Sequence, residues 1–153
     1  MKKTVKIMII LGAVLMISLL GGCRGNVKVS GITSFSYRYT TGNMVNADVF
    51  YGLEYKNGTY TATVKPNGTP EEDAEHFKAD NMFEENLRAI LEKYKVSKWN
   101  GFNKTNKMVL DGNSFYLDIY MEEGEISAHG YMSWPDGYAD FKEEIINLFE
   151  SIK

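Results

Sequence analysis

Tyrosines, one aspartate and one histidine recur at alternate positions in two neighbouring segments near the end of the chain. Residues 115–121 and 126–132 each alternate apolar and polar side chains, which is typical of half-buried strands. Glu123-Gly124 between them predicts a two-residue hairpin turn, which puts the apolar side chains on one buried face. On the other face this register opposes Tyr120 with Ser127, Asp118 with His129, and Tyr116 with Tyr131.

Such a patch is compatible with three interpretations, which the residues alone leave open. Flat tyrosine rings give a large contact area at little entropic cost, so the patch suits a sugar or a peptide. A carboxylate beside an imidazole can instead tune a general base, as in a weak hydrolase using Asp118 and His129. Tyrosines and a cross-strand ion pair also support strand pairing on the solvent face of many sheets.

The rest of the sequence contains no common catalytic or metal-binding motif. It has no Gly-x-Ser-x-Gly turn and no glycine-rich phosphate loop. Its two histidines, His76 and His129, lie outside any spacing typical of a metal site. The acidic run at residues 71–75 lies where a helix is expected to begin and lacks the alternating ligands of a calcium loop. We therefore expect no enzyme activity, no metal and no cofactor.

The sequence WPDGY at residues 134–138 is the most distinctive run in this region. A capping box from Ser133 to Asp136, or Asp136 alone, would start a final helix here with Trp134 packed on it. An exposed Trp134 beside tyrosines would instead anchor a partner, since Trp and Tyr dominate such contacts. The candidate binding residues are Tyr116, Asp118, Tyr120, His129, Tyr131, Trp134 and Tyr138.

The N-terminus has the pattern of an export leader. Three lysines precede an apolar run at residues 7–20, which is too short to span a bilayer comfortably. Leu20-Gly21-Gly22-Cys23 resembles the lipobox of bacterial prolipoproteins. The resemblance implies that residues 1–22 are removed and that Cys23 receives a diacylglyceryl group, which anchors the protein to the lipid bilayer on the outer face of the cell membrane. An ordinary secretory leader and an uncleaved membrane helix are the alternatives.

Removal of the leader leaves a short acidic chain. Of 153 residues, 131 remain after residue 22, which suits one domain. Three of the 17 basic residues are lost and all 20 acidic residues stay, so the formal charge becomes 14 minus 20, or −6. An acidic domain is a poor nucleic-acid binder, so we expect no nucleic-acid partner.

Hydrophobic periodicity predicts a single α+β domain over residues 32–153, joined to the lipid by a tether at residues 23–31. Strands are expected at residues 32–40 and in a hairpin around Asn57-Gly58, followed by a helix that begins near Thr69. A weak stretch at residues 78–81 leaves open whether this is one helix or a short helix followed by a longer one. A second group at residues 108–110, 115–121 and 126–132 precedes the final helix. We expect an antiparallel sheet of about five or six strands in two groups, each followed by a helix, with the helices on one face.

Three short motifs of the mature chain are similar to small uncharacterised lipoproteins of Gram-positive bacteria. They are Trp99-x-Gly101-Phe102, Asp111-Gly112-x-Ser114-Phe115 and Trp134-Pro135-x-Gly137-Tyr138-x-x-Phe141. This resemblance implies an anchored protein and this order of elements, and no activity. We expect a membrane-anchored extracytoplasmic binding module for a peptide, a glycan or an envelope protein. The alternatives are an inhibitor or accessory subunit of a secreted or envelope enzyme, and the weak hydrolase.

Overall fold

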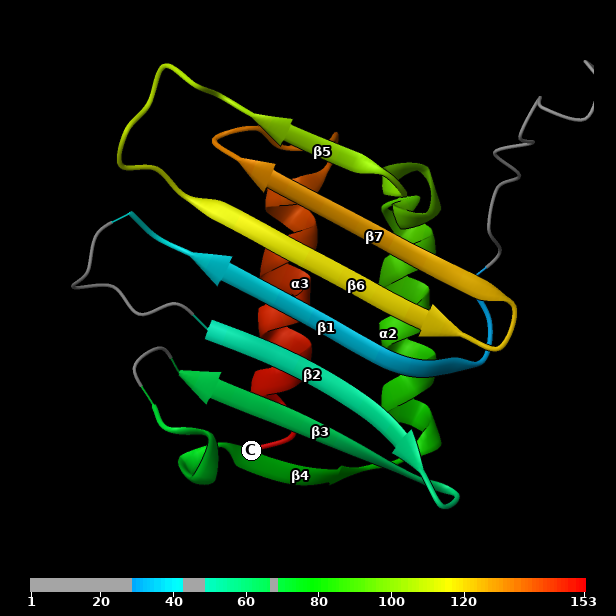
Figure 1. The fold of residues 1–153 in the computed structure, drawn as a ribbon. Coiled ribbons are helices and arrows are strands. Elements are labelled where there is room, and N and C mark those ends of the chain that lie inside the picture. The colour runs from blue at the N-terminus through cyan, green and yellow to red at the C-terminus, as the bar shows by residue number, and fades with distance from the viewer. Residues whose placement is uncertain (1–28, 43–48, 67–68) are drawn as a thin grey trace, which may run out of the picture.

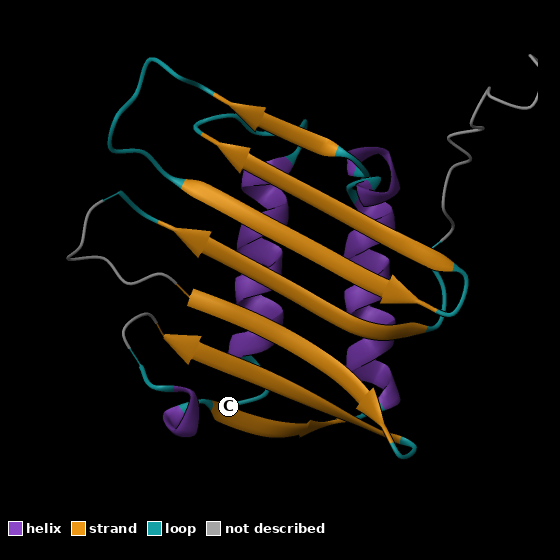
Figure 2. Cartoon of the chain, viewed as in Figure 1, coloured by secondary structure: helices purple, strands orange, loops and turns teal. Residues whose placement is uncertain are grey.

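A computed structural model describes residues 29–42, 49–66 and 69–153, which form a twisted sheet covered by two helices (Figures 1 and 2). Cys23, the lipobox and most of the predicted tether lie outside the described residues. The strands are β1 (Ile32–Thr40), β2 (Val49–Lys56), β3 (Thr59–Pro66), β4 (Glu75–Ala79), β5 (Phe102–Thr105), β6 (Ser114–Met121) and β7 (Gly124–Tyr131). The helices are α2 (Asn81–Lys93) and α3 (Tyr138–Glu150), with short 3-10 helices η1 (Glu71–Asp73) and η2 (Val96–Trp99).

The sheet has the strand order β4-β3-β2-β1-β6-β7-β5. The α+β class is confirmed, but the described residues form seven strands rather than five or six, and the sheet is mixed because β5 runs parallel to β7. Through α2 and η2 the chain crosses from β4 at one edge of the sheet to β5 at the other (Figure 1). The strand predicted at residues 108–110 is wrong, since Met108 and Leu110 are 92% and 94% exposed. The strand that precedes β6 is instead β5, which begins at Phe102, and the Phe102 ring lies 6.1 Å from the Phe115 ring.

The segment after Thr69 is not the predicted start of a helix. It forms η1 and then β4, which pairs with the outer edge of β3 and so satisfies backbone groups that would otherwise be unpaired. Helix α2 begins only at Asn81, where the Asp80 side chain accepts a hydrogen bond of 2.8 Å from the Phe83 backbone amide. The helix after the first strand group therefore exists, but it starts about three turns later than its sequence signature indicates.

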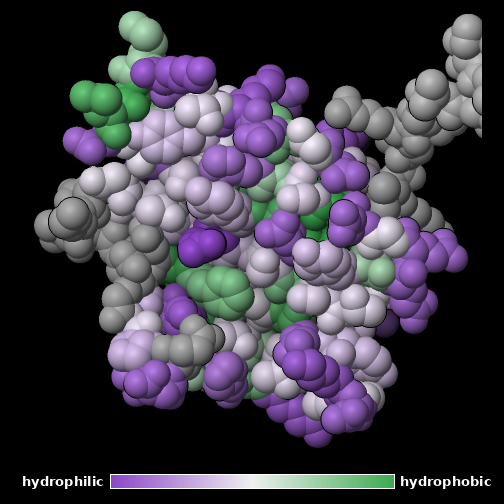
Figure 3. All heavy atoms as spheres, viewed as in Figure 1, coloured by the Kyte–Doolittle hydropathy of each residue, from purple (hydrophilic) through white to green (hydrophobic). Residues whose placement is uncertain are grey.

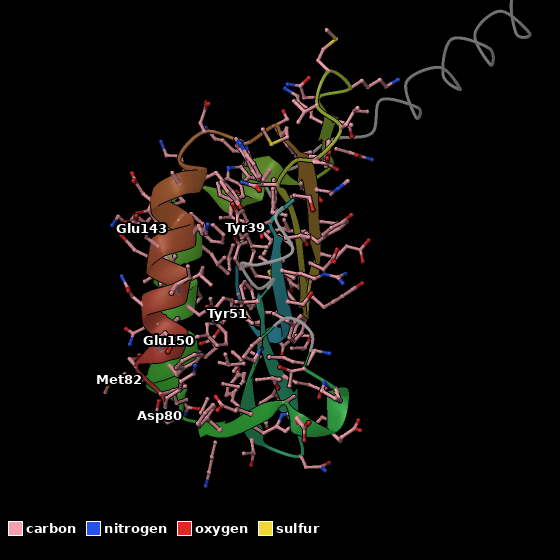
Figure 4. The ribbon with its side chains drawn as sticks, turned by 90° about the vertical axis from the view of Figure 1, so that its left-hand side faces the viewer. Tyr39, Tyr51, Asp80, Met82, Glu143 and Glu150 are labelled. Carbon is pink, nitrogen blue, oxygen red and sulfur yellow. The ribbon has the colours of Figure 1, made fainter. Side chains whose placement is uncertain are left out.

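The core lies between the sheet and the two helices, as the edge-on view shows (Figure 4). Each helix buries one side: α2 buries Phe83, Leu87 and Leu91, and α3 buries Tyr138, Phe141, Ile145 and Phe149. Aromatic rings fill much of this layer. The Tyr51 ring lies 6.4 Å from Tyr37 and 5.2 Å from Phe149, so β1, β2 and α3 meet in one aromatic cluster.

Candidate functional site

The predicted patch lies on the open face of the sheet, which faces away from α2 and α3. Tyr116, Asp118 and Tyr120 come from β6, and His129 and Tyr131 come from β7. They share this face because side chains at alternate positions of a strand point the same way, and their neighbours in sequence fill the core. This face is mostly hydrophilic to neutral, with one hydrophobic ring near its centre and a hydrophobic group at its upper left corner (Figure 3).

The pairing within the patch differs from the predicted register by two residues. Asp118 lies opposite Ser127, and Tyr116 lies opposite His129, so the predicted Asp118–His129 and Tyr116–Tyr131 pairs are wrong. Tyr120 lies opposite Glu125 instead of Ser127. A shift of two residues keeps every side chain on its predicted face, which is why the sequence pattern cannot detect it.

The physical reason for the shift is the fit of Phe115 over Gly130. The hairpin turns at Glu122 and Glu123, and this places Phe115 opposite Gly130 and Ile119 opposite Ile126. A Cβ atom at residue 130 would lie 2.5 Å from the Phe115 ring, so only glycine leaves room for the ring. The predicted turn would instead have placed Leu117 at that gap.

The chemistry of the patch follows from its observed partners. The Ser127 hydroxyl donates a 2.7 Å hydrogen bond to Asp118, while the His129 Nδ1 lies 3.4 Å from the Asn103 side-chain oxygen. The imidazole stacks on Tyr116 with ring centroids 4.3 Å apart, and the Arg38 guanidinium lies 5.1 Å from the centre of the same tyrosine ring. Asp118 and His129 are diagonal neighbours with separate partners, so the carboxylate does not orient the imidazole as a catalytic base requires.

Two other candidates have structural roles. The Tyr131 hydroxyl donates a 2.8 Å hydrogen bond to the Leu110 carbonyl and so fastens the loop between β5 and β6. The Tyr138 hydroxyl lies 2.7 Å from that of Tyr37, in the core, and burial raises the pKa of both phenols well above the usual value. Both phenols are therefore neutral at physiological pH.

Trp134 lies at one end of the sandwich, in the loop that leads from β7 to α3. Its ring stacks on Tyr138 at 4.7 Å and lies 5.7 Å from the Phe115 ring and 6.4 Å from the Tyr39 ring, while 36% of the residue stays exposed. The helix begins without the predicted side-chain cap. Its N-cap residue is Gly137, in the left-handed region at φ 78°, and neither Ser133 nor Asp136 caps it. The indole is therefore packed on one side and open on the other.

A hollow of about 520 Å³ lies beside the exposed part of Trp134, and we call it the α3 hollow. Its aromatic walls are Trp134 and Tyr39, and its polar groups are Asn113, Asp140, Lys142 and Glu143. The ammonium group of Lys142 lies 3.4 Å from the centre of the Tyr39 ring, and burial lowers the pKa of this lysine. Tyr39 lies on the sheet and Glu143 lies on α3 (Figure 4). The hollow thus combines flat rings with groups that donate and accept hydrogen bonds.

A second hollow of about 460 Å³, which we call the lysine hollow, shares Trp134 and Pro135 with the first. It is bordered by Lys95, Lys98 and Lys104. Neither hollow was predicted from the sequence, because its walls come from elements far apart in the chain. The only sequence feature that indicated the α3 hollow was the short spacing between Trp134 and Tyr138.

Within the described residues, no group of three or more His, Cys, Asp or Glu side chains could hold a metal ion. In the same part of the chain, no helix has the length and apolar character needed to cross a membrane.

No protein-family model matches the chain, and no curated protein matches it.

Proposed function

We propose that this protein is a lipid-anchored extracytoplasmic binding module that holds a glycan in the α3 hollow. The observation that carries the proposal is the position of Trp134, which is fixed against Tyr138 on one side and exposed on the other, beside four polar side chains. Saccharides bind to such sites because their apolar ring faces stack on aromatic rings while their hydroxyls bond to polar groups at the edges. An indole already held in place loses little conformational entropy when a ligand binds.

The α3 hollow supports this function better than the open face does. On the open face, Ser127 already bonds to Asp118 and His129 already stacks on Tyr116, and a ligand would have to displace those contacts. In the α3 hollow, Asp140 and Glu143 project from the first turns of α3 beside the ring, and they can accept hydrogen bonds from sugar hydroxyls. Binding rather than catalysis is favoured because the predicted Asp118–His129 pair does not form.

The test of the ligand site is binding of the full-length protein, purified in non-ionic detergent, to a panel of neutral oligosaccharides. We expect Trp134→Ala to abolish binding and Trp134→Phe to retain part of it, because phenylalanine keeps an aromatic face and most of the packing. Tyr120→Ala is the matched control, since it removes an exposed aromatic ring from the open face. If Tyr120→Ala weakens binding and Trp134→Ala does not, the ligand binds on the open face and the assignment is wrong. If no neutral oligosaccharide binds, the glycan proposal fails.

The anchor is tested separately, by mass spectrometry of the protein from its native cells. We expect a polypeptide that begins at Cys23 and carries a diacylglyceryl group, and we expect Cys23→Ser to release the protein from membranes. A chain that still begins at Met1, or an unmodified Cys23 thiol, would contradict the anchor without affecting the ligand site.

A further inference from the structure

One stretch of this acidic chain has the opposite charge. Between residues 93 and 110 there are five lysines and no aspartate or glutamate. The stretch begins at the last residue of α2 and includes η2 and β5. A run of one sign is often only a solvated surface, so the question is whether the fold gathers these charges in one place.

The fold gathers three of them around the lysine hollow. Lys95 directly precedes η2, Lys98 lies within it, and Lys104 comes from β5 at the edge of the sheet. Asp136 is the one carboxylate at this hollow, so the formal charge of its lining is three minus one, or +2. In the described part of the chain, no ion pair joins any of the three lysines to a carboxylate.

Lys93, in the same region, differs from these three lysines because it forms an ion pair with a carboxylate. Its ammonium group bonds to Glu144 of α3, and this hydrogen bond, with a second from Tyr94, lowers the pKa of the Glu144 carboxyl. Lys93 is thus neutralised by the protein itself. The three lysines at the hollow carry charge that the protein leaves available, and like charges held close together favour an anion between them.

Lys95 has a backbone conformation that is unfavourable for a residue with a side chain. Its φ of 53° and ψ of 43° lie in the left-handed region, directly after the C-cap residue of α2. Glycine is the residue that helices most often use there, because a side chain destabilises this conformation. A lysine at a site suited to glycine is consistent with a role for its side chain.

The hollow also has an aromatic lining. Trp99, Phe102 and Trp134 all contribute to it, and Trp99 is only 4% exposed. Rings lower the local dielectric constant, which strengthens the attraction between an ammonium group and a bound anion. Trp134, which is 36% exposed, also offers a flat surface to the group that carries the anion.

We propose that the lysine hollow binds the anionic group of a glycan, a phosphate or a carboxylate, with Lys95, Lys98 and Lys104 around the charge and the sugar ring against Trp134. This proposal deepens the proposed function by naming the charge of the ligand. It rests on that function only in taking the ligand to be a glycan. The anion site uses lysines that the α3 hollow does not contain. Each site can therefore fail without the other.

The test is a fluorescence titration of the full-length protein in non-ionic detergent, because both tryptophans of the chain border the lysine hollow. Three probes separate charge from shape: an oligogalacturonate with carboxylates on rings, a polyphosphate with charge and no rings, and a maltooligosaccharide with rings and no charge. We expect the oligogalacturonate or the polyphosphate to bind, and we expect raising the salt from about 50 to about 500 mM to weaken that binding strongly. The probe that binds more tightly identifies the anionic group.

Variants locate the site. We expect the double variant Lys98→Gln with Lys104→Gln to lose at least about tenfold in affinity for the anionic probe. Lys56→Gln is the matched control, because it removes the same charge from an exposed position in β2, four strands away from β5 in the sheet, and should bind as the unmodified protein does. Asp136→Asn should bind more tightly, since it removes the carboxylate that repels the anion. A merely structural role for the lysines does not predict that gain.

Three outcomes would overturn the proposal: no binding of either anionic probe at low salt, equal losses in the lysine double variant and the Lys56 control, or weaker binding by Asp136→Asn. Binding of the anionic probes without the maltooligosaccharide would retain the lysine hollow and exclude a neutral glycan in the α3 hollow. Binding of the maltooligosaccharide alone would do the reverse.

Discussion

The buried pair of hydroxyls between Tyr37 and Tyr138 permits a sharp test of how the sheet is joined to α3. Tyr37 is fully buried in β1, Tyr138 is the first residue of α3 and 6% exposed, and their oxygens are 2.7 Å apart. Tyr37→Phe or Tyr138→Phe removes one oxygen without changing the ring. Each single variant leaves the other hydroxyl buried without its partner, whereas the double variant removes both polar atoms.

The size of the effect follows from the cost of an unsatisfied buried hydroxyl. Each single variant should lower the free energy of unfolding by about 1–3 kcal/mol. The double variant should lie within about 1 kcal/mol of the unmodified protein, because two apolar rings remain in contact and neither oxygen is left alone. For a domain of this size, 1 kcal/mol corresponds to roughly 3–5 °C in Tm, so the difference is measurable by heating as well as by denaturant.

The assay is urea unfolding followed by near-ultraviolet circular dichroism, with the two single variants and the double variant measured side by side. Tyr120→Phe serves as a control, since Tyr120 is 50% exposed and its change should stay within about 0.5 kcal/mol. If the loss in the free energy of unfolding of the double variant equals the sum of the losses of the two single variants, the hydroxyls do not interact. In that case the 2.7 Å contact would not join α3 to the sheet.

Three further predictions follow from backbone conformation, titration and packing. Lys95→Gly should raise the free energy of unfolding by about 1 kcal/mol, because glycine adopts the left-handed conformation without strain; a loss in urea unfolding would contradict this. Burial raises the pKa of Tyr51 to about 12 from 10.0, so its neutral form stabilises the fold fully below pH 10, and this contribution should disappear as the pH rises to about 12. Tyr51→Phe should make the alkaline decline in stability shallower in pH-dependent thermal melts, and an unchanged slope would refute the assignment. Gly130→Ala should cost about 3 kcal/mol, since the new Cβ would lie 2.1 Å from the Ser133 carbonyl oxygen and 2.5 Å from the Phe115 ring; chemical unfolding that shows a neutral change would mean that this backbone relaxes freely.

The hairpin around Asn57-Gly58 shows what the sequence could predict. The predicted hairpin forms, with Tyr55 opposite Tyr60 and Leu53 opposite Ala62, and both turn residues have positive φ angles of 52° and 79°. Asparagine and glycine both tolerate this conformation, so the turn is favourable only at Asn57 and Gly58. A local preference of the backbone fixes the pairing there.

The second hairpin shows where local rules stop. Glu122, Glu123 and Gly124 offer no such preference, and moving the turn by one residue keeps all apolar side chains on the buried face. The choice depends on how Phe115 fits over Gly130, which is a contact between strands and not a property of either segment. The same limit explains β4, because a helix-like start at Thr69 gives way to pairing with an edge of β3 that the local sequence does not reveal.

The candidate site was predictable only in part. Alternation correctly placed the tyrosines of β6 on a face away from the core, and the sequence around Trp134 marked a helix start. The two hollows depend on Tyr39, Lys104 and Trp134, which belong to β1, β5 and the loop before α3. A concave site made by three distant segments has no periodic pattern in the sequence, so it appears only when the chain is folded.

The central position of β1 has a consequence for how the protein is made. This first strand pairs with β6, whose residues lie about 80 positions later, and Phe141, Ile145 and Phe149 of α3 are needed to cover the sheet. A chain synthesised from its N-terminus must therefore wait for its last helix before the middle of the sheet is shielded from water. Loss of α3 alone would leave β1 exposed to water. We therefore expect a chain truncated before α3 to be degraded as a whole, with no partly folded form accumulating.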